Sequence, residues 1–324
     1  MRIFRHTDPL PGDARGSVVA IGNFDGLHRG HRAVVARTRE IAAALGAPSA
    51  ALTFEPHPRR LFDPEGEPFR LSSLRAKARR LEALGLDLLF VQHFDHAFAR
   101  IPAAGFVSRV LVGGLGARHI VVGEDFAFGH RRQGNVGLLR EMAAKGGFAV
   151  TPAPQVLAEG GTVISSNTIR QCLREGDPGA AAALLGHPWE VDGRVIRGEG
   201  RGHDLGFPTA NIDMDDYLRP QPGIYAVRAG IDEGMDTRWH DGAASYGVRP
   251  HFGGGEPRLE VHLMDFRGDL YGRHLRVAFA AYLRGERAFP DTASLIRQME
   301  ADVAEARAVL APFRGEAAGG APRG

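Results

Sequence analysis

The chain has 324 residues, with 40 Lys+Arg against 38 Asp+Glu, 44% hydrophobic and 24% charged residues, all ordinary values for a globular protein. This length predicts about two domains, and the composition excludes a wholly disordered chain, a coiled coil and an acidic tail. Glycine is the outlier, because its 43 residues are nearly double the usual ~7%. The excess indicates either a flexible linker or several places where the backbone approaches a ligand closely.

The single cysteine, Cys172, excludes an intrachain disulfide and a zinc site built on cysteines. It is typical of a reducing compartment, and we expect the cytoplasm. The first residues lack the apolar core of a signal peptide, and no apolar run reaches the length of a membrane span. The sequence pI of about 8.9 suits small anionic ligands as well as nucleic acid. We therefore expect no nucleic-acid or membrane partner, and the oligomeric state is open between a monomer and a weak homo-oligomer.

The first half of the chain alternates strand and helix patterns. Strands are predicted at 17–24, 51–54, 87–91, 119–123 and 148–153, and helices at 30–45, 74–84, 103–112 and 135–145. This alternation predicts right-handed crossovers and a Rossmann-like parallel sheet with helices on both faces. Ligands of such sheets bind beyond the carboxyl ends of the strands, where the strand order reverses.

The pattern changes near residue 187. Short segments separated by Gly and Pro then predict antiparallel strands in a small β-barrel, and a final helix is expected over 291–312. The domains expected are 1–186 and 187–313, followed by a disordered tail at 314–324.

The sequence GNFDGLHRGH at 22–31 leads from the first predicted strand into the first helix. Gly22 and Gly26 permit tight backbone geometry, and His28 and His31 share one side of the first turn. Since the start of a helix favours anions, this motif predicts a site for nucleotide phosphates, with Gly30 leaving room for a base or a phosphate. The alternative is a plain turn with two surface histidines.

A second motif, ISSNTIR at 164–170, lies late in the same domain. Ser165 and Ser166 precede a short helix and Arg170 lies one turn into it, so hydroxyl groups and a guanidinium can bind triphosphate oxygens together. The alternative is an N-cap followed by a surface arginine.

A glycine-rich segment, GRVIRGEGRGHDLGFPTANI at 193–212, opens the second domain. Thr209 and Asn211 lie two positions apart in its strand-like end, so their side chains face the same side. A hydroxyl and an amide oxygen suit a hard cation such as Mg²⁺, which also takes phosphate oxygens. The alternative is a capped turn. Further along, Glu260 and His262 share one face of the predicted strand RLEVHLMDF at 258–266.

The first two motifs together resemble nucleotidyltransferases of the histidine-glycine-histidine type. With TFEPHP at 53–58, VVGEDFAFGH at 121–130 and the PTAN run, the chain resembles the bacterial bifunctional riboflavin kinase/FAD synthetase family from about residue 17 to 312. It departs from the family pattern at Asn167, where the family usually has Thr or Ser, and at His251, where it usually has Thr.

The resemblance implies two reactions that use ATP: phosphorylation of riboflavin to FMN in the second domain and adenylylation of FMN to FAD in the first. It implies catalytic roles for His28, His31, Arg170 and Glu260, and a magnesium site at Thr209 and Asn211. The residues expected to bind ATP are Gly22, Phe24, Asp25, Gly26, Gly30, Ser165, Ser166, Gly198, Gly202, Gly206, Thr209 and Asn211. Those expected to border the flavin are His57, Asp125 and Arg284.

Some alternatives stay open at this point. His57 is equally well explained as a turn residue fixed between two prolines. The rival functions are transfer of a nucleotide to another phosphate-bearing acceptor, and a regulator that binds flavin or RNA. The intact PTAN segment and Glu260 argue against the first rival, and an aromatic content of only 8% argues against the second.

Overall fold

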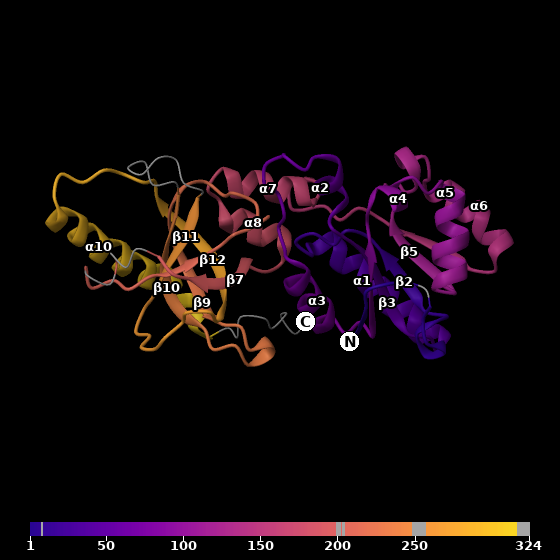
Figure 1. The fold of residues 1–324 in the computed structure, drawn as a ribbon, viewed down its shortest axis with the longest axis horizontal. Coiled ribbons are helices and arrows are strands. Elements are labelled where there is room, and N and C mark those ends of the chain that lie inside the picture. Colours follow the sequence, from indigo (N-terminus) through magenta and orange to yellow (C-terminus); the bar gives the residue numbers. More distant parts are fainter. Residues whose placement is uncertain (8, 199–201, 203–204, 248–256, 316–324) are drawn as a thin grey trace. The chain divides into compact units, whose positions relative to one another are not determined.

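The computed structural model describes the chain except for residues 8, 199–201, 203–204, 248–256 and 316–324. The chain forms two compact units (Figure 1). The first comprises residues 1–67 and 74–165, and the second comprises 68–73 and the chain from 166 onward. Among the helices of the described residues, none has the length and apolar character needed to cross a membrane.

A parallel sheet of six strands forms the centre of the first unit, in the order β1-β4-β3-β2-β5-β6. Its strands are β1 Arg2–Phe4, β2 Val18–Ile21, β3 Ser49–Glu55, β4 Leu88–His93, β5 His119–Gly123 and β6 Ala149–Ala153. The short β1 was not predicted. The order reverses between β2 and β5, because the chain runs from β2 toward β4 on one side and from β5 to β6 on the other. Ligands of such sheets bind beyond the strand ends at this point.

Helices cover both faces of this sheet. Alternate residues of each strand enter two separate cores, one shared with α1 and α3 and the other with η2 and α6. The helical segments of the first unit are η1 Gly12–Ala14, α1 Arg29–Leu45, α2 Pro58–Phe62, α3 Leu74–Ala83, α4 His96–Ala99, α5 Ala103–Gly105, η2 Phe106–Gly114, η3 His130–Arg132 and α6 Val136–Gly146. The helix expected over 103–112 is a short α-helical turn that continues as a π-helix.

A closed antiparallel barrel forms the second unit, with strand order β10-β11-β8-β7-β12-β9. Its strands are β7 Trp189–Ile196, β8 Ala210–Ile212, β9 Gly223–Ile231, β10 His240–Gly247, β11 Arg258–Leu263 and β12 His274–Arg284. Its helical segments are α7 Ser166–Arg174, α8 Pro178–Leu185, η4 Gly234–Asp236, α10 Thr292–Leu310 and η5 Ala311–Gly315. Figure 1 shows α10 lying along the barrel, where it packs on β9, β10 and β12. The expected fold class, a parallel-sheet domain and a β-barrel with a C-terminal helix, is confirmed.

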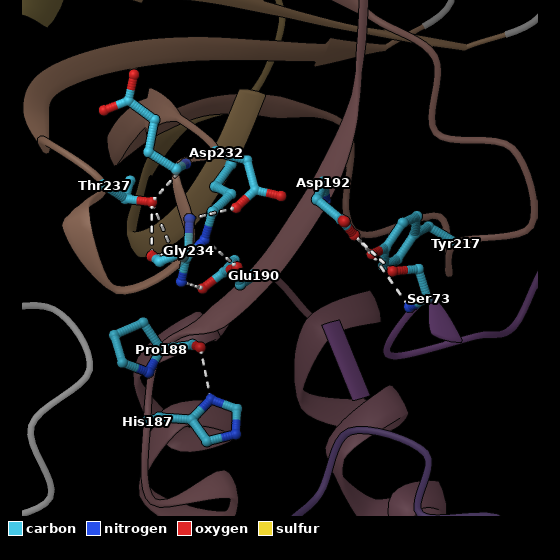
Figure 2. A network of polar contacts seen from close by, with 11 residues as sticks. Ser73, His187, Pro188, Glu190, Asp192, Tyr217, Asp232, Gly234 and Thr237 are labelled. Carbon is cyan, nitrogen blue, oxygen red and sulfur yellow. Dashed lines mark hydrogen bonds and ion pairs between the residues drawn. The ribbon is translucent and has the colours of Figure 1, made fainter. Parts of the chain in front are cut away.

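Residues 68–73 come from the first half of the sequence but belong to the barrel unit. The indole Nε1 of Trp189 donates to the Leu71 carbonyl at 3.0 Å, and the Ser73 hydroxyl donates to Asp192 at 2.7 Å. Figure 2 shows Asp192 facing both Ser73 and Tyr217, whose hydroxyl also donates to it. Burial, and then the charge of Asp192, raise the pKa of Tyr217 well above its ordinary value. The strap 68–73 is therefore anchored at several points of the second unit.

A buried ion pair closes another part of the barrel. Arg276 donates from two guanidinium nitrogens to the Glu190 carboxylate at 2.8 and 3.0 Å, and both side chains are less than a tenth exposed. Arg276 also donates to the Thr237 hydroxyl and the Gly234 carbonyl, each at 3.0 Å, beside the Glu190 shown in Figure 2. A buried charge pair of this kind fixes one arrangement of β7, β12 and the β9–β10 connection, since breaking it leaves an uncompensated charge.

Candidate active sites

The loop between β2 and α1 holds the first predicted motif in an unusual backbone shape. Phe24 and Leu27 adopt φ angles of 48° and 47°, and Gly26 has φ 78°. Gly26 adopts its φ without strain, but Phe24 and Leu27 are strained, and strain of this kind clusters at ligand sites. Phe24 is buried, and its ring packs edge-on against that of His31 with centroids 5.3 Å apart. The loop is therefore held in one conformation at the start of α1, where a helix favours an anion.

His28 and His31 lie face to face at that helix start. Their ring centroids are 3.7 Å apart and the rings are inclined by 20°. His28 is the N-cap of α1, since its Nδ1 accepts from the backbone N–H of His31 at 3.3 Å. A Cβ on Gly30 would lie 3.1 Å from the His28 ring, so this glycine makes room for the ring rather than for a base. Asp25, also expected at this site, is buried, and Gly22 contacts the ring of Phe24 in the same way.

A buried cation lies near the histidine pair. Lys77 of α3 is 1% exposed, and its Nζ donates to Thr53 Oγ1 at 3.1 Å and to Glu55 Oε1 at 3.3 Å. Burial above all, then the charge of His28 and then that of Lys77, hold the pKa of His31 well below its usual 6.5. The site therefore places a neutral imidazole near a buried lysine whose charge is paired with Glu55.

Lys77 was missed by the sequence reasoning. It lies on the same helical stripe as Leu74 and Leu81, three and four positions away, where an apolar residue is the rule. A lysine in the apolar stripe of a helix is the signal that could have identified it, because a buried charge needs a partner or a function.

An apolar cavity of about 660 Å³ opens beyond the strand ends of the first unit, at the reversal of strand order. It is lined by residues in and after β3 and residues that follow β2, β4 and β5, including Gly22 of the loop between β2 and α1, the proposed nucleotide loop at 22–28. Much of its wall is phenylalanine: Phe54, Phe98, Phe106 and Phe128 pack with ring centroids 5.5 to 6.4 Å apart. Its size and its aromatic wall suit a flat, ring-shaped ligand.

His57 and Asp125, the residues expected to border a flavin, both line this cavity. His57 is also the N-cap of α2, because its Nδ1 accepts from the Arg59 N–H at 3.1 Å. Both interpretations of His57, a turn residue and a cavity residue, therefore describe its position. The cavity therefore brings these two residues together with Gly22.

The ISSNTIR segment spans the division between the two units. Ser165 is the last residue of the first unit, and Ser166 begins α7 in the second. Arg170 is buried, and its guanidinium donates to the Phe69 carbonyl at 2.8 Å and to Asn167 Oδ1 at 2.7 Å. Asn167, which departs from the family pattern, thus orients the guanidinium that the sequence analysis assigned to catalysis.

In the barrel, Asn211 of β8 lies directly opposite Glu260 of β11 in the antiparallel register. Side chains at such opposed positions lie within contact distance of one another. A Cβ on Gly198 would lie 2.3 Å from Asn211 Nδ2, and one on Gly202 would lie 3.2 Å from Thr209 Oγ1. Gly198 and Gly202 therefore pack closely against the two side chains expected to bind the metal.

The end of that loop is fixed by two further features. Gly206 has φ 85°, a left-handed value that glycine adopts without strain. The Pro208 carbonyl accepts from His262 Nδ1 at 2.9 Å, and the Phe207 and His262 rings meet edge-to-face at 5.5 Å. His262, left unassigned by the sequence, therefore holds the backbone just before Thr209.

Arg284, expected to contact the flavin, lies at the end of β12 and binds Asp302 of α10 through two hydrogen bonds of 2.8 and 2.6 Å. Gln298 Nε2 donates to the same carboxylate at 2.7 Å. The role of Arg284 toward a flavin stays a prediction, because its guanidinium is oriented here by α10. His251, the second departure from the family pattern, lies outside the described residues.

The donor set at the barrel loop fits a magnesium ion. No group of three or more His, Cys, Asp or Glu residues that could hold a metal occurs in the part of the chain that the structure describes. Thr209 and Asn211 offer neutral oxygens instead, and Mg²⁺ usually takes few protein ligands beside waters and substrate phosphates.

Comparison with known proteins agrees with this architecture. The family model described as FAD synthetase matches residues 10–168, and the model described as riboflavin kinase matches residues 185–310. A bifunctional riboflavin kinase/FMN adenylyltransferase of Pseudomonas fluorescens is 42% identical over 313 residues, 96% of this chain and 99% of that protein. The protein of the same description from Escherichia coli is 39% identical over 292 residues, 90% of this chain and 92% of its own.

Among solved structures, one titled as a macrolide-efflux protein from Streptococcus pneumoniae superimposes with a TM-score of 0.81 at 29% identity, covering 94% of this chain and 98% of its own. We take from it the fold, which includes both units. Since two family models together cover most of the chain and the named relatives align over nearly their whole length, the chain belongs to the bifunctional riboflavin kinase/FMN adenylyltransferase family.

Proposed function

We infer that this protein makes FAD from riboflavin in two steps, phosphorylating riboflavin to FMN and then adenylylating FMN, with ATP as co-substrate of both. We assign the adenylyl transfer to residues 1–186 and the kinase to 187–313, although α7 and α8 belong to the barrel unit by their contacts. We keep the cytoplasm as the proposed location, since the one cysteine suits a reducing compartment.

The assignment of adenylyl transfer to the first domain rests on one observation, which is that the loop after β2 and the aromatic cavity share residues. Gly22 and Asn23 of the nucleotide loop also line the aromatic cavity. A flavin ring in this cavity and a nucleotide at the loop would therefore meet at one place, as a reaction between FMN and ATP demands.

In the proposed adenylyl transfer, an FMN phosphate oxygen attacks the α-phosphorus of ATP. The new oxygen–phosphorus bond forms as the bond to the leaving pyrophosphate breaks. The attacking group is already an anion, so the protein needs to position the reactants and neutralise charge rather than remove a proton. We assign the positioning of the phosphates to His28 and His31, and the neutralisation of charge to Lys77 and Arg170, with Ser165 and Ser166 as hydrogen-bond donors.

In the proposed kinase step, the riboflavin 5′-hydroxyl oxygen attacks the γ-phosphorus of ATP and ADP leaves. Glu260 accepts the hydroxyl proton, because a neutral alcohol needs a base. Thr209 and Asn211 would hold Mg²⁺, which neutralises charge on the β- and γ-phosphates when bound. We keep Gly198, Gly202 and Gly206 as residues whose backbone contacts ATP, while the missing side chains of Gly198 and Gly202 let the loop lie against Asn211 and Thr209.

Variants that lose only one of the two activities test this function. Purified protein incubated with riboflavin, ATP and Mg²⁺ should yield FMN and FAD, identified by chromatography. We expect His28→Ala to lower FAD formation from FMN about a hundredfold and to leave FMN formation intact, whereas Asn211→Ala should do the reverse. Absence of both products from the wild type would refute the function, and parallel losses in both variants would refute the assignment of sites.

A further inference from the structure

Two consecutive arginines, Arg131 and Arg132, line the aromatic cavity and have no role in the function described above. They form the 3-10 turn η3, which follows β5 and the Phe126–Phe128 stack. Within the described residues, neither guanidinium takes part in a hydrogen bond, an ion pair or a ring contact. Both side chains are exposed, so their charges are available to a ligand in the cavity.

The backbone of this turn has an unfavourable conformation. Arg131 and Arg132 have φ angles of 52° and 58°, in the left-handed region that glycine or asparagine adopts more readily. Two adjacent arginines in this region are disfavoured. Strain of this kind persists where the surroundings enforce it, and it is concentrated at ligand sites.

The surroundings do enforce it. Phe128 and Gly134 exchange two backbone hydrogen bonds of 3.0 and 2.8 Å across the turn, and the His130 N–H donates to the Ile101 carbonyl at 2.8 Å. A Cβ on Gly129 would lie 2.5 Å from the Ala103 backbone, so the turn is packed against α5. The arginines are therefore presented on a fixed support rather than on a mobile loop.

The charged side chains that line the cavity indicate an anionic ligand. The residues that line the cavity include three arginines, Arg59, Arg131 and Arg132, and one carboxylate, Asp125, which is a formal excess of two positive charges with histidine left out of the count. A phosphate monoester carries about −1.5 to −2 at pH 7. Paired guanidinium groups bind phosphate through two-pronged hydrogen bonds. The cavity thus combines an aromatic wall for a ring with a positive edge for a phosphate.

We propose that Arg131 and Arg132 bind the phosphate group of the flavin acceptor and so make the cavity selective for FMN over a flavin without phosphate. The proposal rests on the proposed function, because it names what these arginines do at the adenylylation site. It adds a recognition element on the loop after β5 to the histidine motif on the loop after β2.

Kinetics of FAD formation by the whole protein test this proposal. The KM for FMN at saturating ATP should rise about tenfold in Arg131→Gln and in Arg132→Gln, and further in the double variant, as the loss of a charged hydrogen bond predicts. The KM for ATP should stay within about twofold of the wild type. Arg140→Gln, which removes an exposed arginine from α6, is the matched control and should leave both constants unchanged.

Inhibition by lumiflavin distinguishes binding of the flavin phosphate from binding of the flavin ring. This flavin carries a methyl group in place of the ribityl phosphate chain, so the kinase domain cannot phosphorylate it. Its inhibition constant against FMN should be the same in the wild type and the arginine variants. A parallel rise for lumiflavin would overturn the proposal, because the arginines would then shape the ring site. A rise in the KM for ATP alone would overturn it too.

A third variant distinguishes a role of Arg132 in binding phosphate from a role in the stability of the turn. Arg132→Gly removes the guanidinium and the backbone strain together, so the variant should melt no lower than the wild type and still have the raised KM for FMN. A lower melting temperature with an unchanged KM would mean a structural role. If the wild type formed no FAD, the proposed function and this proposal would both fail. If it forms FAD and the variants keep the wild-type KM for FMN, only this proposal fails.

Discussion

The two proposed phosphate sites differ in the parts of the protein that would bind the phosphates. The loop after β2 is short and strained, and it depends on a helix start, two stacked histidine rings and a buried lysine. The loop before β8 depends on glycines that lie against a threonine and an asparagine, with a glutamate on the neighbouring strand. In the proposed reactions, the first arrangement would offer positive charge to an anionic nucleophile, and the second would offer oxygen ligands and a base to a neutral one.

This difference predicts that a base matters in only one of the sites. Glu260→Gln should lower FMN formation about a thousandfold, since general-base groups contribute about 10² to 10⁴, while FAD formation from added FMN stays at the wild-type rate. Both rates are measured by chromatography of the flavins. Glu233→Gln, an exposed glutamate of the barrel unit, should change neither. If Glu260→Gln formed FMN at the wild-type rate, neither site would depend on a base and this difference between the sites would be refuted.

The complementary prediction concerns the buried cation. Lys77→Met should lower FAD formation about a hundredfold, because a fixed charge beside the phosphates is lost, and should spare FMN formation. Lys145→Met, at an exposed lysine on α6, provides the control. A melting temperature near that of the wild type is needed to interpret the loss as electrostatic. A folded variant with full FAD formation would show that Lys77 serves only the packing of α3.

A smaller effect tests the role of close packing in the barrel loop. In Gly198→Ala the new methyl group would meet the Asn211 amide, so kcat/KM for riboflavin phosphorylation should fall about tenfold, or roughly 1.4 kcal/mol. Gly12→Ala, where nothing lies within 4 Å of the added Cβ, is the control. Unchanged FMN formation in Gly198→Ala would mean that the glycine serves another purpose than access to Asn211.

The smallest expected effect is that of His31 on the stability of the folded protein at low pH. Because the pKa of His31 is lower in the folded protein than the ordinary 6.5, the unfolded chain binds more protons once the pH falls below that value. Stability should therefore be lost as the pH drops below 6.5, and His31→Gln should lessen this loss. His119, whose pKa is also lowered by burial, adds to the loss in the same direction.

Urea unfolding at several pH values measures the effect of His31→Gln. His96→Gln, at an exposed position of α4, should keep the pH dependence of the wild type. An unchanged dependence in His31→Gln would contradict the burial of a neutral imidazole at the nucleotide loop.

The fold class followed from patterns that local sequence carries well. Short apolar runs identified five of the strands of the first unit and stripes of period 3.6 identified its helices, because strands buried on both faces and amphipathic helices show these patterns. The strand β1 was missed since three residues carry too little pattern, and the π-helix after Ala103 has no pattern of its own. The barrel was recognised from short segments between glycines, and the burial of Leu259 and Val261 inside it agrees with the predicted alternation of β11.

The site residues depended more on spacing along the chain. His28, His31 and Gly30 are neighbours in sequence, so their proximity could be predicted, although the space at Gly30 is filled by a histidine ring. Lys77, Arg131 and Arg132 could not be found this way. Lys77 contacts β3 and the two arginines follow β5, and these strands flank β2, so their positions depend on the strand order, which is a property of the fold rather than of a motif.

The strap 68–73 has a consequence for the gene as well as for the protein. The kinase unit is encoded in two separate stretches, and the coding sequence for most of the other unit lies between them. A fragment that begins at residue 187 lacks the Leu71 carbonyl that accepts from the Trp189 indole and the Ser73 hydroxyl that donates to Asp192. Excision of the kinase as a contiguous cassette therefore leaves buried polar groups without their native partners, and the two activities are linked by folding as well as by a shared substrate.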